Sequence, residues 1–151
     1  MSLRYVAQCD KPTVCNITNH SYFNLNGSGS AMGHLLWVDA DAYTPIDADS
    51  LPVAQSAEVA GTPFDFRAEK AVGRDIGADC EQLRLAGGYD HNFILRPQAG
   101  LRLAARLTGE VSGIAMECWT QQPGVQVYTA NFLETDSAAK GGVPYGRRQA
   151  V

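Results

Sequence analysis

The sequence predicts a mainly β protein, an antiparallel β-sandwich. The 151 residues are 45% hydrophobic and only 19% charged, a balance that suits one domain with an apolar core. Fifteen glycines and seven prolines supply many turns. Leu101, Leu103, Ala105 and Leu107 alternate with polar or small residues, which is the period of a half-buried strand. Short strands separated by frequent turns are typical of a sandwich.

The first half of the chain contains two short strand candidates, residues 14–18 and residues 35–38. Residues 42–46 should also be extended, because the residue before a proline avoids the helical region. Short helices are plausible only further along, at residues 73–76 or 80–85. Helix is therefore expected to be a minor component.

The last third predicts a run of strands. Residues 92–95 form a short apolar strand before a proline, and residues 114–120 alternate through Ile114, Met116 and Cys118. A Gln-Pro-Gly turn then leads into a further strand at residues 125–129. Together with the strand around residues 101–107, these segments are interpreted as an antiparallel meander.

Charge and composition argue against several classes of partner. The formal net charge is −4, whereas nucleic-acid binding needs a concentrated basic surface. No apolar stretch approaches the ~20 residues that cross a bilayer, and no signal peptide is visible at the start. None of the four cysteines forms a C-x-x-C pair, which argues against zinc or redox use. Reduced thiols, a cytoplasmic location and no metal are the resulting expectations.

His20 is the strongest candidate for chemistry. It follows a predicted strand, where Asn19 and Ser21 can orient the imidazole and Tyr22 can stack on the apolar face of a sugar. An imidazole exchanges protons near neutral pH, so His20 can serve as a general acid or base. From the local pattern alone, a hydrogen-bonded turn histidine is the favoured alternative.

Two further residues are candidates for binding a polar ligand. Asp90 follows two glycines, and its carboxylate can accept hydrogen bonds from sugar hydroxyls; a turn cap is the alternative. His91 should point away from Asp90, because neighbouring strand residues face opposite ways. Gln126 offers a carboxamide on one face of a strand, although an exposed polar residue is the simpler interpretation. His34 is interpreted as structural or exposed.

Four ordered blocks resemble the galactose mutarotase (aldose 1-epimerase) family: residues 10–25, 61–67, 88–95 and 123–133. The resemblance implies a large antiparallel β-sandwich, the galactose mutarotase-like supersandwich, that needs no metal or organic cofactor. It implies interconversion of the α and β anomers of hexoses such as galactose and glucose by acid/base opening of the sugar ring. His20 would be the acid that serves the ring oxygen, and Asp90 and Gln126 would hold sugar hydroxyls.

The chain also departs from the family pattern. Residues 1–151 resemble a partial domain, in which residues 1–3 look like an added start joined to family-like sequence at Arg4. By resemblance, an N-terminal histidine and arginine are missing, and the catalytic glutamate should follow shortly after Val151. Little or no activity and self-association through exposed sheet edges are therefore expected. The alternatives are a non-catalytic carbohydrate-binding protein and a sugar-phosphate epimerase, which would need Arg67, Arg74 and Arg84 gathered at the cleft.

Overall fold

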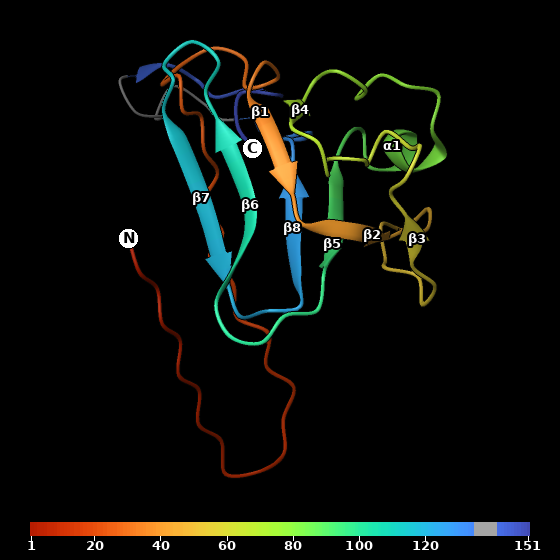
Figure 1. Cartoon of the computed structure of the whole chain (residues 1–151), viewed down its shortest axis with the longest axis vertical. Helices are drawn as coiled ribbons and strands as arrows, with labels where there is room; N and C mark the ends of the chain where they lie inside the picture. The colour runs from red at the N-terminus through yellow and green to blue at the C-terminus, as the bar shows by residue number, and fades with distance from the viewer. Residues whose placement is uncertain (135–141) are drawn as a thin grey trace.

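Two four-stranded antiparallel sheets make up the protein, for which the computed structural model describes residues 1–134 and 142–151 (Figure 1). Sheet A has the order β4 (Lys70–Ala71), β1 (Leu35–Val38), β6 (Arg102–Thr108), β7 (Ala115–Thr120). Sheet B has the order β3 (Ala57–Glu58), β2 (Ala40–Thr44), β5 (Asp90–Leu95), β8 (Gly124–Tyr128). The one helix in the described residues is α1 (Glu81–Leu85). The prediction of a mainly antiparallel β protein is confirmed, as is a short helix in the 80–85 region.

The hydrophobic core lies between the two sheets. Alternate residues of each strand face inwards, as the strand period requires: Leu36 and Val38 are buried in sheet A, and Phe93 is buried in sheet B. Phe64, from the loop between β3 and β4, stacks on Tyr43 with ring centroids 4.1 Å apart. The loop thus packs its aromatic rings against the inner face of sheet B and holds the strands of this sheet in place.

The inward phase of β6 differs from the prediction. Arg102 and Ala104 are buried, whereas Leu103 is only half-buried. The register between β6 and β7 shifts between Leu103 and Ala105, so a bulge reverses which residues face the core. Strict alternation from Leu101 to Leu107 was therefore wrong for the first half of this strand.

The predicted meander is also wrong except for the hairpin of β6 and β7, because β5 pairs with β2 and β8 and not with β6. β7 pairs with β6 in sheet A, but β8 pairs with β5 in sheet B. The turn at residues 121–123 therefore connects the two layers and does not join neighbours in one sheet. As a result β7 and β8 are both terminal strands of their sheets.

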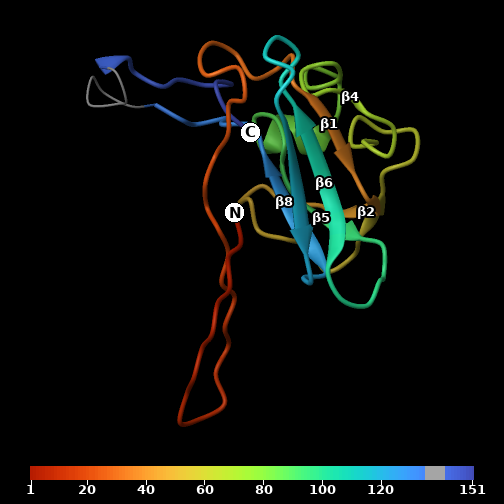
Figure 2. The same ribbon diagram turned by 60° about the vertical axis from the view of Figure 1, so that its left-hand side comes forward.

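Residues 1–22 contain no strand, so the strand predicted at residues 14–18 is wrong. Figure 2 shows this N-terminal segment as a long loop that projects away from the sandwich, and residues 1–22 are all exposed. A β-propensity cannot become a strand without a neighbour that accepts its backbone hydrogen bonds. The segment joins the body at Phe23, which exchanges two backbone hydrogen bonds with Val151, at 2.7 and 2.9 Å.

Candidate active site

The outer face of sheet B carries the two predicted binding residues. Side chains alternate along β5, so Asp90 and Asn92 face outwards while His91 and Phe93 are buried at 0% and 1% exposure. The prediction that Asp90 and not His91 faces the open side is confirmed. On the neighbouring strand β8, Gln126 lies directly opposite Asn92.

Asp90 and Gln126 form a hydrogen-bonded pair. Gln126 Nε2 donates to Asp90 Oδ1 at 2.8 Å. Both side chains line a hollow of about 150 Å³, whose walls are Thr44, Ile46, Ser50, Pro52, Ala86, Asp90, Asn92, Gln126 and Phe132. A carboxylate that only accepts, beside a carboxamide that both donates and accepts, matches what a polyhydroxylated ligand needs.

A second hydrogen-bonded pair completes the floor of the hollow. Asn92 Nδ2 donates to Thr44 Oγ1 at 3.0 Å, across strands β5 and β2. Gly124 makes room for this carboxamide, because a Cβ at that position would lie 2.3 Å from Asn92 Oδ1. Sequence reasoning missed both Asn92 and Thr44. The sequence did contain a signal for Asn92, because residues two positions apart on a strand face the same side and Asn92 follows Asp90 by two.

His20 lies outside the hollow and is connected to it through two tyrosines. Its ring contacts Tyr22 edge-on, with centroids 5.2 Å apart, and Tyr22 lies 5.4 Å from the ring of Tyr128. Tyr128 is the residue directly opposite Asp90 on β8. Partial burial, and then the nearby Tyr128 and Asp90, raise the pKa of Tyr22. The imidazole is therefore exposed, on the β8 side of the Asp90–Gln126 pair.

The other two histidines are structural. His91 Nδ1 accepts from the backbone N–H of Asp90, and its Nε2 lies 3.2 Å from Gln82 Oε1. Burial lowers the pKa of His91 to about 4, which keeps the ring neutral at physiological pH. His34 is fully buried; its Nε2 accepts from the backbone of Leu25 at 2.8 Å, so the structural interpretation is confirmed.

A polar cluster of the buried Thr129 and Asn131 and the half-buried Arg148 lies next to Ala86 in the wall of the hollow. Arg148 donates to Thr129 Oγ1 at 2.7 Å and to the carbonyl of Gly87 at 2.6 Å. It also donates to Asn131 Oδ1, and Asn131 Nδ2 donates to the Ala86 carbonyl at 2.8 Å. Burial lowers the pKa of Arg148. No sequence signal pointed to this cluster, because its members come from three separate segments.

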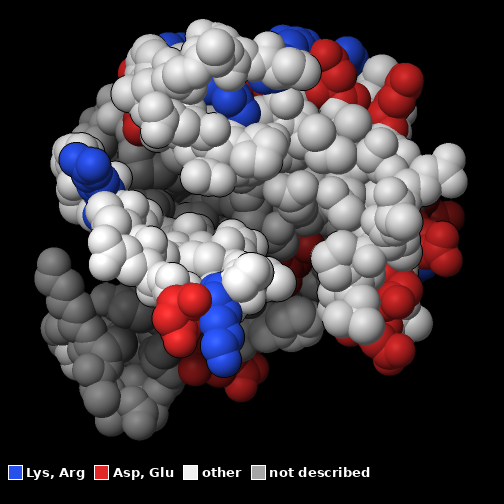
Figure 3. Space-filling view, turned by 90° about the horizontal axis from the view of Figure 1, so that it is seen from below, with Lys and Arg blue, Asp and Glu red and all other residues white. Residues whose placement is uncertain are grey.

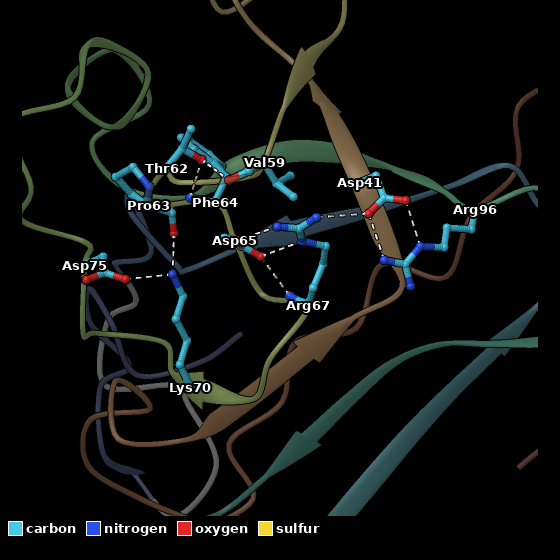
Figure 4. A network of polar contacts seen from close by, with 10 residues as sticks. All are labelled: Asp41, Val59, Thr62, Pro63, Phe64, Asp65, Arg67, Lys70, Asp75 and Arg96. Carbon is cyan, nitrogen blue, oxygen red and sulfur yellow. Dashed lines mark hydrogen bonds and ion pairs between the residues drawn. The ribbon is translucent and has the colours of Figure 1, made fainter.

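The arginines that a sugar-phosphate site would need are engaged elsewhere. Arg67 binds Asp65 and Asp41, and Asp41 also binds Arg96 (Figure 4). Arg74 lies 3.7 Å from Asp75, and Arg84 pairs with Asp79. None of the three lines the hollow. On the face seen in Figure 3, basic side chains are scattered and form no continuous patch.

The described residues, 1–134 and 142–151, contain neither a metal-binding cluster nor a membrane-spanning helix. No three His, Cys, Asp or Glu side chains come together there as ligands for a metal ion. No helix in this part of the chain has the length and apolar character to cross a membrane. All four cysteines are free thiols, and burial raises the pKa of Cys118.

Comparison with known proteins gives a consistent result. The family model described as aldose 1-epimerase matches residues 1–149. Galactose mutarotase of Bos taurus is 40% identical over 145 residues, which cover 95% of this chain and 41% of the relative. Aldose 1-epimerase of Escherichia coli (strain K12) is 37% identical over 153 residues, covering 100% of this chain and 44% of the relative. The chain therefore spans about two-fifths of the length of these curated relatives.

Solved structures show the same similarity. The structure of galactose 1-epimerase from Lactobacillus acidophilus NCFM superposes with a TM-score of 0.66 at 31% identity, over 87% of this chain and 37% of that one. The GalM/aldose epimerase homologue from C. elegans superposes with a TM-score of 0.73 at 28% identity, over 85% and 38%.

Proposed function

The chain belongs to the aldose 1-epimerase family, and on that premise we propose that residues 1–151 form part of a hexose mutarotase domain. The observation that carries the proposal is the Asp90–Gln126 pair on the floor of the hollow, with Gln126 Nε2 2.8 Å from Asp90 Oδ1. Relatives at about 40% identity are named galactose mutarotase, which supports a free hexose as the ligand.

In the proposed reaction the sugar ring opens and recloses. Asp90 and Gln126 hold ring hydroxyls, and His20 gives a proton to the ring oxygen while a base takes the proton of the anomeric hydroxyl. The aldehyde rotates before closure. His20 is exposed and connected to Asp90 through Tyr22 and Tyr128, so it must turn towards the hollow, which a projecting segment permits.

No glutamate lines the hollow in the described structure, so we propose that the chain alone is inactive or weakly active. Spontaneous mutarotation is already measurable, and one general acid contributes on the order of 10²–10⁴-fold at most. Polarimetry of freshly dissolved α-galactose, with and without the chain, tests this. A rate close to that of a complete relative would overturn the proposal of weak activity.

Hexose binding gives a test that does not depend on turnover. Galactose should perturb the amide NMR signals of β5 and β8, and Asp90→Asn should weaken the effect, because the substitution removes the negative charge and replaces one accepting oxygen with a donating NH2 group. Asp79→Asn is the matched control, since the Asp79 side chain is 96% exposed and away from the hollow. Equal binding by wild type and Asp90→Asn would refute the assignment of the site.

A non-catalytic carbohydrate-binding role is the second candidate, and the same hollow without a glutamate supports it. The full-length gene product separates the two candidates: mutarotation above the buffer rate favours the enzyme, and binding without it favours the binding protein. The sugar-phosphate alternative is disfavoured, because Arg67, Arg74 and Arg84 are paired with carboxylates outside the hollow.

We also propose that the chain self-associates. β7 and β8 are edge strands, and exposed edges pair readily with another chain. The projecting N-terminal segment adds exposed apolar side chains, such as Val6 at 72% and Val14 at 97%. Sedimentation velocity should show concentration-dependent dimers or larger species, and a stable monomer throughout would contradict the idea. The four free thiols are consistent with a reducing, cytoplasmic location.

A further inference from the structure

Thr44, Asn92 and Gln126 form a polar line across the outer face of sheet B. Thr44 lies directly opposite Asn92 on β2 and β5, and Asn92 lies directly opposite Gln126 on β5 and β8. Neighbouring strands are about 4.8 Å apart, so the line is about 10 Å long. All three residues line the hollow. The line therefore extends the Asp90–Gln126 pair in the direction away from Tyr128 and His20.

The Asn92–Thr44 pair has hydrogen-bonding capacity to spare. One amide proton of Asn92 is used in the 3.0 Å bond to Thr44 Oγ1. Its second amide proton, its carbonyl oxygen and the hydroxyl proton of Thr44 have no partner among the described residues. The pair is neutral, whereas Asp90 is an anionic acceptor. This end of the hollow thus suits a hydroxyl group better than a charged substituent.

We propose that Asn92 is a specificity-determining residue that reads the hydroxyl groups on C3 and C4 of the sugar, and that Thr44 positions its carboxamide. This rests on the proposed function. In a pyranose ring C3 lies opposite the ring oxygen and C4 lies opposite the anomeric carbon. The bond between the anomeric carbon and the ring oxygen faces His20 in this pose. Asp90 and Gln126 lie under the middle of the ring, so C3 and C4 point towards Asn92. Glucose and galactose differ only at C4, so Asn92 contributes to the choice between them.

The absence of a side chain at Gly124 leaves room for the carboxamide of Asn92. A Cβ at Gly124 would lie 2.3 Å from Asn92 Oδ1 and 3.2 Å from the carbonyl oxygen of Phe93. The backbone on one side cannot move easily, so the carboxamide of Asn92 would have to leave its place. Gly124→Ala is therefore a way to displace Asn92 without removing any polar group.

The test compares three sugars, galactose, glucose and 4-deoxygalactose, by NMR titration of the chain. The substitutions Thr44→Val, Asn92→Ala and Gly124→Ala should each lower the affinity for the preferred hexose by about 2- to 12-fold, the range for one net hydrogen bond. They should change the galactose-to-glucose affinity ratio and weaken 4-deoxygalactose less than the preferred hexose, because that sugar keeps the C3 hydroxyl and lacks the C4 hydroxyl. Thr108→Val, the same substitution on the outer face of sheet A, should leave all three affinities unchanged.

The outcomes separate this inference from the proposed function. Hexose binding that depends on Asp90, with an unchanged galactose-to-glucose ratio in all three variants, overturns the role of Asn92 and leaves the function standing. Equal losses for all three sugars also overturn it, because a merely structural role would act in that way. Absence of any Asp90-dependent binding overturns both.

Discussion

Gly88→Ala should be among the most damaging single substitutions in the part of the chain that the structure describes. Gly88 has a φ of +148°, which side-chain-bearing residues rarely adopt, and a Cβ there would lie within 2.4 Å of both Asn131 Oδ1 and Arg148 Nη1. The substitution therefore combines backbone strain with displacement of the half-buried Arg148 guanidinium from its acceptors. Strain of about 1–3 kcal/mol and lost charge-assisted hydrogen bonds of about 1.5–3 kcal/mol give a loss of about 2.5–6 kcal/mol.

Urea unfolding followed by tryptophan fluorescence measures this loss. With a slope of about 2 kcal/mol per M, the midpoint should fall by about 1.3–3 M. Gly100→Ala is the matched control, because Gly100 has a φ of +77° but nothing within 4 Å of its Cβ position. Its cost is strain alone, about 1–2 kcal/mol. If Gly88→Ala lowers the midpoint no more than Gly100→Ala does, the argument from the Arg148 cluster is wrong.

Two further predictions concern the histidines. His91 stays neutral in the folded state, with its pKa lowered by burial to about 4 from 6.5, so the unfolded chain takes up the proton first as pH falls. Stability should drop by about 2 kcal/mol between pH 7 and pH 5, and a urea midpoint that does not change over this interval would contradict it. Tyr22→Ala removes the edge-on ring 5.2 Å from His20 and should shift the His20 ring-proton NMR signal towards its unfolded position. An unchanged signal would show that the contact does not persist in solution.

Strands with strong periodicity could be predicted from the sequence, and those that depend on a distant partner could not. Residues 35–38 match β1, and residues 92–95 lie within β5, because each is a short apolar run bounded by turn residues. The segment at residues 14–18 has equal propensity but no neighbouring strand. The bulge beside Leu103 and the pairing of β8 with β5 arise from tertiary pairing, which local periodicity does not contain.

The residues of the candidate site also separate into those that the sequence indicated and those that it did not. Asp90 and Gln126 were candidates from their local pattern, the family resemblance added to that interpretation, and the structure brings them within hydrogen-bonding distance. Their functional role stays a prediction. His20 was also a candidate from its local pattern and the resemblance, but it is exposed and is connected to the hollow through Tyr22 and Tyr128. Arg148 could not be found, because its acceptors lie 17 to 61 residues away along the chain.

The backbone pairing of Phe23 with Val151 fixes the register of an engineered strand that is attached to Val151. The two residues exchange hydrogen bonds of 2.7 and 2.9 Å, so an extended peptide fused after Val151 would run antiparallel beside residues 16–22. Counted from that pair, the third fused residue faces His20 in a non-hydrogen-bonded pair, where side chains approach most closely. Moving a glutamate along such an extension by one residue would turn its carboxylate to the opposite face. A set of fusions with the glutamate at successive positions would therefore show how proton transfer depends on the placement of the carboxylate.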